Sequence, residues 1–205
     1  MTRQPLTYLI VLSLLLFAWP SVSKADGISE NFNELPTSLN ATNIGAFHVT
    51  SGTVDVVGGS LFGNLCASPE SGNCVDLDGN NGQAGQISSA KLTLTPGVYT
   101  LSFDLLGSQR YGVATSTTVT LGSLYDQTFL LGSNDLTDGI VNITIDVTTT
   151  TVTQLIFTSN TPGYYGALLD NVTLTDPVAT PEPATLSLLG VGLLGLMFGR
   201  RHAAK

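Results

Sequence analysis

Asp170 is the acidic residue whose surroundings say most about its chemistry, because it lies within the largely apolar segment Leu168 to Leu174. Side chains alternate between the two faces of a strand, so Asp170 shares a face with Leu168, Val172 and Leu174. This pattern predicts that its carboxylate points toward the core. A buried carboxylate must be paired, hydrogen-bonded or coordinated to a cation, since an isolated charge is costly to remove from water.

A second acidic segment, from Asp76 to Gly82 (DLDGNNG), invites comparison with an EF-hand calcium loop. Asn81 stands where that loop needs glycine for its sharp turn, and Ile87 stands where it needs a bidentate glutamate. Val75 and Leu77 alternate with the aspartates. The segment therefore favours a strand that enters a Gly-Asn turn over an ion-binding loop.

Aromatic faces that could hold a sugar are few in this chain. Its only tryptophan, Trp19, lies in an N-terminal segment that we expect to be removed. The best remaining candidates for ligand binding are Tyr164 and Tyr165, in TPGYYG, together with Tyr111 beside Arg110. Ordinary loop packing explains these tyrosines equally well.

Residues arranged for catalysis are not evident. His48 is the only histidine before the C-terminal segment, and the sequence has neither a G-x-S-x-G elbow nor a glycine-rich phosphate loop. A hydrolase that uses two carboxylates needs them at a defined separation in space, and nothing in the sequence selects two from the others. We therefore expect a protein that is not an enzyme and has no catalytic residue.

The charge is unevenly distributed along the 205 residues, which carry a formal net charge of −8. Between residues 26 and 176 only Lys91 and Arg110 oppose fourteen Asp and Glu side chains, a net charge of 2 − 14 = −12. Nucleic acid is an unsuitable partner for such a domain, because phosphate binding needs a basic face. The acidity fits divalent cations or simple solubility.

The N-terminus has the form of a secretory signal peptide. Arg3 precedes an apolar run from Leu9 to Trp19, and small side chains at Ser23 and Ala25 suit a signal peptidase. The run spans about 16 Å as a helix, which is too short for an ordinary membrane helix. We expect cleavage after Ala25; the alternative is an uncleaved anchor.

Cys66 and Cys74 are the only cysteines. Export exposes them to an oxidising compartment, which favours a disulfide over two free thiols. A closed zinc site is not favoured, because it would need two more Cys or His ligands and the exported segment offers only His48. Closing a loop of about nine residues contributes roughly 2.6 kcal/mol on the chain-entropy estimate.

The C-terminus combines three features in a fixed order. Pro181-Glu182-Pro183 favours an extended and accessible segment. An uncharged run over residues 184–199 follows, long enough for a short membrane helix, and then Arg200 and Arg201 can hold the tail on the cytoplasmic side. The alternative is a plain membrane anchor.

This tripartite segment, PEPATLSLLGVGLLGLMFGRRHAAK, resembles the PEP-CTERM sorting domain of exopolysaccharide-producing Gram-negative bacteria. The resemblance implies recognition by an exosortase-type membrane transpeptidase, which would cut near Pro181-Glu182-Pro183. It implies a membrane-anchored precursor that is delivered to the cell envelope, the outer surface or the extracellular matrix.

Between the two targeting segments, strand signals recur about every ten residues and no stretch favours a soluble helix. Clean alternation marks Gly97–Gly107 and Ile140–Thr148. Further strands are predicted at 46–50, 53–57, 74–78, 86–95, 117–121, 128–131, 151–158 and 167–175. The fold class predicted is all-β, an antiparallel β-sandwich of jelly-roll type.

The order of these segments, ending in GALLDNVTL, also resembles a galactose-binding-like jelly roll. In such domains the final-strand aspartate, here Asp170, helps to hold a structural calcium ion with ligands near the first strand, here around Asn33. Relatives often have an acidic residue where this chain has Asn33. Calcium and a metal-free Asp170 bonded to backbone or solvent therefore both stay open, and no other cofactor is expected.

The predicted organisation is a signal peptide (1–25), a β-sandwich (26–176), a linker with the Pro-Glu-Pro motif (177–183), a membrane helix (184–199) and a basic tail (200–205). The leading functional hypothesis is an exported, non-enzymatic protein of the envelope or biofilm matrix. The alternative is a carbohydrate-binding module delivered by the same route.

Overall fold

The predicted antiparallel β-sandwich is confirmed by a computed structural model, which describes residues 26–59, 61–62, 65–66, 72–134 and 140–175. The predicted signal peptide, linker, membrane helix and basic tail lie outside these residues. Within them no helix is long and apolar enough to cross a membrane. The strands are β1 (Ile28–Glu30), β2 (Ser38–Ala41), β3 (Asn43–Ile44), β4 (Phe47–Ser51), β5 (Val54–Val57), β6 (Cys74–Asp76), β7 (Gln86–Ser89), β8 (Leu92–Leu94), β9 (Gly97–Leu106), β10 (Thr115–Leu121), β11 (Tyr125–Leu131), β12 (Ile140–Val147), β13 (Thr151–Thr153), β14 (Leu155–Ser159) and β15 (Leu168–Thr175).

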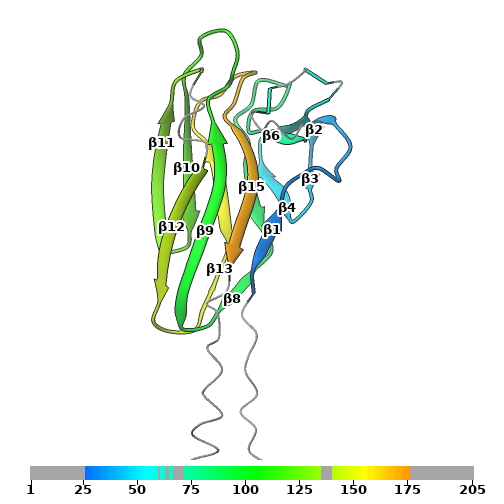
Figure 1. Ribbon diagram of the computed structural model, residues 1–205. Helices are drawn as coiled ribbons and strands as arrows, with labels where there is room; N and C mark the ends of the chain where they lie inside the picture. Colours follow the sequence, from blue (N-terminus) through cyan, green and yellow to red (C-terminus); the bar gives the residue numbers. More distant parts are fainter. Residues whose placement is uncertain (1–25, 60, 63–64, 67–71, 135–139, 176–205) are drawn as a thin grey trace, which may run out of the picture.

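Two large sheets form the sandwich. The larger sheet has the order β12-β9-β15-β6-β5-β2, with β1 paired to β15, and the smaller has the order β11-β10-β14-β7-β4-β3. A third, short sheet joins β13 to β8. Figure 1 shows β10 and β11 behind the layer that contains β9 and β12.

Alternating side chains fill the space between the sheets. Tyr99, Leu101, Phe103 and Leu105 of β9 are each at most 1% exposed, as their alternation predicts. The Phe103 ring makes edge-on contacts with Phe129 of β11 and Phe157 of β14, at centroid distances of 5.8 and 5.2 Å. These aromatic pairs join the two sheets.

Two predicted strands are each divided in the structure. The predicted strand 86–95 forms β7 and β8, and the predicted strand 151–158 forms β13 and β14. In both cases the chain changes sheets, because β7 pairs with β14 whereas β8 pairs with β13. Continuous alternation in the sequence does not show where a strand leaves its neighbour.

The expectation that Asp170 points into the main core is wrong. Asn171 has a φ of +49°, and the pairing of β15 with β9 shifts register between Asp170 and Thr173. A bulge of this kind changes which residues share a face. Leu169 and Val172 therefore face the main core, and Asp170 belongs to the opposite face with Leu168.

The two ends of the domain lie together at one end of the sandwich. Ile28 of β1 is opposite Leu174 of β15, and Thr175 is opposite Thr100 near the start of β9. The loop after Leu106 lies at the other end of β9, about 30 Å away for a strand of ten residues. Figure 1 shows the start of β1 and the end of β15 at the same end of the sandwich.

Candidate functional site

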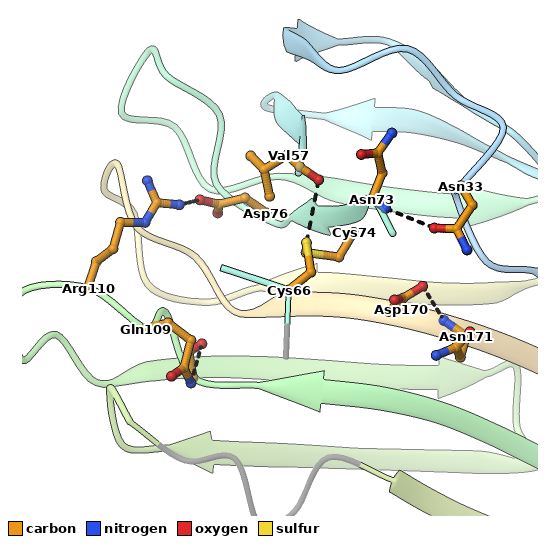
Figure 2. The surroundings of a disulfide bond; sticks show 11 residues. Asn33, Val57, Cys66, Asn73, Cys74, Asp76, Gln109, Arg110, Asp170 and Asn171 are labelled. Carbon is orange, nitrogen blue, oxygen red and sulfur yellow. Dashed lines mark hydrogen bonds and ion pairs between the residues drawn. A yellow bond between two sulfur atoms is a disulfide. The ribbon is translucent and has the colours of Figure 1, made fainter. Parts of the chain in front are cut away.

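The predicted disulfide between Cys66 and Cys74 is confirmed, with a Cα–Cα distance of 5.7 Å (Figure 2). Both sulfurs are buried on the outer face of the larger sheet, in a small apolar cluster. Its other buried members are Val57 of β5, Leu106 of β9 and Leu168 of β15. The disulfide thus fastens the segment between β5 and β6 over this face.

Beside this cluster, Asp76 and Arg110 form a buried ion pair between Asp76 Oδ2 and Arg110 Nη2 (Figure 2). The other carboxylate oxygen, Oδ1, accepts the N–H groups of Asp78 and Gly166 at 3.0 and 2.8 Å. Burial raises the pKa of Asp76 to about 7, while these two N–H groups and Arg110 act to lower it. The ion pair fixes the loop that follows β9 to β6.

A second buried carboxylate, Asp55 of β5, lies opposite Asp76 in the sheet. It accepts the N–H groups of Asn40 and Asn80 at 2.7 and 3.2 Å. Burial raises the pKa of Asp55, and these hydrogen bonds lower it. At this point the outer face of the larger sheet therefore carries two adjacent buried carboxylates, and Arg110 is paired to one of them.

Arg110 lies between two aromatic rings, and a third ring packs against one of them. The guanidinium carbon of Arg110 lies 5.1 Å from the ring centroid of Phe62 and 5.1 Å from that of Tyr165. The Tyr165 ring in turn lies 5.1 Å from that of Tyr111. We call Phe62, Arg110, Tyr165 and Tyr111 the ring row. Phe62 is 44% exposed and Tyr111 82% exposed, so the row presents aromatic surface to solvent.

The backbone of the ring row is held in an uncommon conformation. Phe62 and Tyr111 of the row, and Gln109 next to Arg110, have φ values of +63°, +52° and +56°, in the left-handed region that residues other than glycine seldom adopt. Each such residue costs on the order of 1 kcal/mol and persists because its surroundings hold it.

Tyr164 and Tyr165, adjacent in sequence, have different neighbours. Tyr165 is in the ring row, whereas Tyr164 lies over the turn at Gly82, where a β-carbon would be only 3.2 Å from Tyr164 Cζ. Tyr164 is 56% exposed. The structure therefore joins Tyr165 to Tyr111 and places Tyr164 beside them, over a separate loop.

Asp78 lies below the Gly163 backbone, since a β-carbon on Gly163 would be 3.8 Å from Asp78 Oδ2. Its side chain is fully buried, and neither carboxylate oxygen has a hydrogen-bond partner among the described residues. Burial raises the pKa of Asp78 to about 6; the nearby Ser159 hydroxyl lowers it without reaching hydrogen-bond geometry. Burial therefore keeps the pKa of Asp78 well above that of an exposed aspartate.

The predicted calcium ligands Asn33 and Asp170 have separate hydrogen-bond partners. The Asn33 side-chain oxygen accepts the N–H of Asn73 at 2.8 Å, and Asp170 accepts the N–H of Asn171 at 2.7 Å (Figure 2). In the part of the chain that the structure describes, no group of three or more His, Cys, Asp or Glu side chains is arranged to hold a metal ion. Calcium binding stays a prediction.

Whether Asp170 holds calcium can be tested through its protonation. Burial, together with the negative charges of Asp104 and Glu30, raises the pKa of Asp170 to about 6, against the N–H of Asn171, which lowers it. The folded protein thus holds a proton that the unfolded chain releases between pH 3.8 and about 6, and this stabilisation is lost as the pH rises through 6.

At pH 8, Asp170→Asn should therefore raise the free energy of unfolding by about 1–2 kcal/mol. The gain should vanish at pH 3, where the carboxyl is protonated in both the folded and the unfolded protein. Thermal melts of the exported protein at both pH values measure this, with Asp126→Asn on the exposed face of β11 as the matched control. If calcium is bound, the substitution will destabilise the protein and a chelator will lower its melting temperature.

Sequence reasoning missed the ion pair between Arg110 and Asp76. The available signal was composition, because Arg110 is one of two cations among residues 26–176 and is followed directly by Tyr111. An arginine in so acidic a domain is expected to have a carboxylate partner. Nothing in the sequence chose Asp76 from fourteen acidic residues.

Residues 179–201 match the family model of the PEP-CTERM protein-sorting motif. The match confirms the sorting signal and includes Pro181, Glu182, Pro183, Arg200 and Arg201. It implies an exported protein whose membrane-anchored precursor is processed by an exosortase.

Among solved structures, the K1 cleaved adhesin domain of Lys-gingipain from Porphyromonas gingivalis W83 is similar over 74% of this chain and 98% of its own, with 13% identity and a TM-score of 0.48. CBM35 of Abf62 from Cellvibrio japonicus is similar over 75% and 95%, with 14% identity and a TM-score of 0.42. A family 35 carbohydrate binding module from Clostridium thermocellum is similar over 74% and 99%, with 11% identity and a TM-score of 0.40. No curated protein matches the sequence significantly. These likenesses assign neither ligand nor activity.

Proposed function

We propose that this chain, which carries a PEP-CTERM sorting motif, is a non-enzymatic protein of the bacterial envelope or biofilm matrix whose sandwich binds neutral polysaccharide at the ring row. The observation that carries the proposal is the exposed aromatic surface of Phe62, Tyr165 and Tyr111 around Arg110. Aromatic faces of this kind stack on the apolar faces of sugar rings.

The position of the ring row suits this function. Both ends of the sandwich, at Ile28 and Thr175, lie at one end of β9, and the ring row lies beyond the other end. The signal peptide and the sorting segment are therefore both attached opposite the aromatic surface. A domain fixed to the envelope through its C-terminus would present the ring row outward.

The charges favour a neutral ligand over an anionic one. Arg110 is paired with Asp76 and covered by two rings, so it has little capacity to bind an additional anion. Lys91, the other cation of residues 26–176, precedes β8. With a net charge of −12, these residues would repel polysaccharides rich in uronic acids.

Replacing the two tyrosines of the ring row tests the proposal. The purified exported protein should bind at least one neutral polysaccharide on a glycan array, and Tyr111→Ala and Tyr165→Ala should each weaken binding roughly tenfold, a loss of about 1.4 kcal/mol, because each removes a ring that stacks on the sugar. Tyr164→Ala should have a smaller effect, since Tyr164 lies over a separate loop.

Val152→Ala is the matched control, because Val152 is an exposed apolar side chain (63%) on β13, which is outside the two large sheets. Its binding should equal that of the native protein. Binding that survives both Tyr111→Ala and Tyr165→Ala, or no binding to any neutral polysaccharide, would contradict the proposal.

A further inference from the structure

The larger sheet has one long open edge, formed by β12. All eight residues of β12 pair with β9, without a register shift, from Ile140 opposite Asp104 to Val147 opposite Gly97. No described strand pairs with its other side, and Figure 1 shows β12 at the border of its sheet. The opposite edge of this sheet is β2, which has four residues and pairs irregularly with β5.

The features that usually protect an edge strand are missing from β12. Natural sheets block open edges with lysine, proline, bulges or short strands, because unpaired N–H and C=O groups attract another strand. The sequence IVNITIDV contains no lysine, arginine, proline or glycine, and its only charge is that of Asp146. The strand is therefore suited to accept a partner strand.

The side chains of β12 are complementary to those of a second, antiparallel β12. With Thr144 opposite its own copy, the outward-facing Asn142 lies opposite Asp146, so that an amide can donate to a carboxylate in each of two symmetry-related pairs. On the inward face, Ile143 lies opposite Ile145. Side chains on one face of each strand meet the same face of the partner, as pairing requires.

This arrangement also improves the burial of the inward face. The inward-facing Val141 and Ile143 are only partly buried, although they pack against the main core, whereas Ile145 is 3% exposed. A partner strand would cover the open side of this row. Burial of apolar surface and pairing of free backbone groups would then act together.

We propose that β12 pairs with β12 of a second copy of this chain, antiparallel about Thr144, and so joins the larger sheets of two molecules. Because residues 26–176 carry a net charge of −12, the copies repel each other at low ionic strength. The dimer should therefore strengthen as salt is added. This inference does not depend on the polysaccharide ligand.

The pairing can be tested at Asn142, which is exposed, because two substitutions there should change the dimer dissociation constant in opposite directions. Asn142→Asp places like charges opposite each other twice and should raise the dimer dissociation constant roughly fivefold, whereas Asn142→Lys should lower it by a similar factor. Light scattering of the purified exported protein over a concentration series measures both. Thermal melts will show that each variant is folded.

A single introduced cysteine tests the register. The native cysteines are joined to each other, so Thr144→Cys should yield a covalent dimer on oxidation, seen on a non-reducing gel. Thr128→Cys at the centre of β11, the open edge of the smaller sheet, is the matched control and should remain monomeric. A protein that is monomeric at all concentrations and salt levels, or equal crosslinking of both variants, would overturn the proposal.

Discussion

Replacing Arg110 with methionine should lower the free energy of unfolding by about 1–2 kcal/mol at pH 8, because the buried Asp76 carboxyl then lacks its cation and must take up a proton, which costs about 1.4 kcal/mol one pH unit above a pKa of about 7. Methionine keeps an apolar stem between the Phe62 and Tyr165 rings, so the loss will report mainly on the charge. For a chain of this size the melting temperature should fall by roughly 5 °C.

The loss should be largely reversed in the double variant Arg110→Met/Asp76→Asn. The asparagine oxygen can still accept the N–H groups of Asp78 and Gly166, which both bind Asp76 Oδ1. Lys91→Met, which removes the same charge from an exposed site, should leave the melt unchanged. An Arg110→Met melt equal to that of Lys91→Met would show that the ion pair does not stabilise the fold.

Acidification should reduce the cost of Arg110→Met. The pKa of Asp76 is raised to about 7, so the folded protein holds a proton that the unfolded chain releases between pH 3.8 and about 7. Stability from this group is present at low pH and is lost as the pH rises through 7. At pH 5 the variant's carboxyl is protonated and no longer needs a cation, so its melt should approach that of the native protein.

Local patterns in the sequence were sufficient for much of the fold. The alternation of Tyr99, Leu101, Phe103 and Leu105 specifies which face of β9 is buried, because the period of two needs no knowledge of other strands. The disulfide followed from export and from the presence of two cysteines in the chain. The sorting motif was recognisable because its three parts are contiguous.

Features that depend on distant residues could not be predicted. Arg110 and Asp76 are 34 positions apart, and Tyr111 meets Tyr165 because the loops after β9 and before β15 lie at the same end of the sandwich. The bulge at Asn171 changes the face of Asp170, and only its pairing with β9 reveals it. The sequence named Tyr111 and Tyr165 as candidates but could not place them together.

Processing at the sorting motif is the second large effect that we expect. Glu182→Ala keeps the uncharged run of residues 184–199 and the basic tail, but it removes the recognition side chain between two prolines. Cleavage should be lost, and the protein should stay in the membrane as an unprocessed precursor. Glu34→Ala, which removes a carboxylate from an exposed position, is the matched control and should be processed normally.

Retention of the precursor should depend on Arg200 and Arg201. These arginines supply most of the positive charge that follows the short apolar run, and that charge holds the tail on the cytoplasmic side. A host without an exosortase should keep the full-length membrane form.

The central claim, that this chain is a sorted and processed surface protein, is tested most directly by the C-terminal peptide of the protein recovered from the envelope or matrix of its native host. Mass spectrometry should find a C-terminus near Pro181-Glu182-Pro183, with residues 184–205 absent. A C-terminal peptide that runs through to Lys205 would contradict the claim and leave the segment as an anchor.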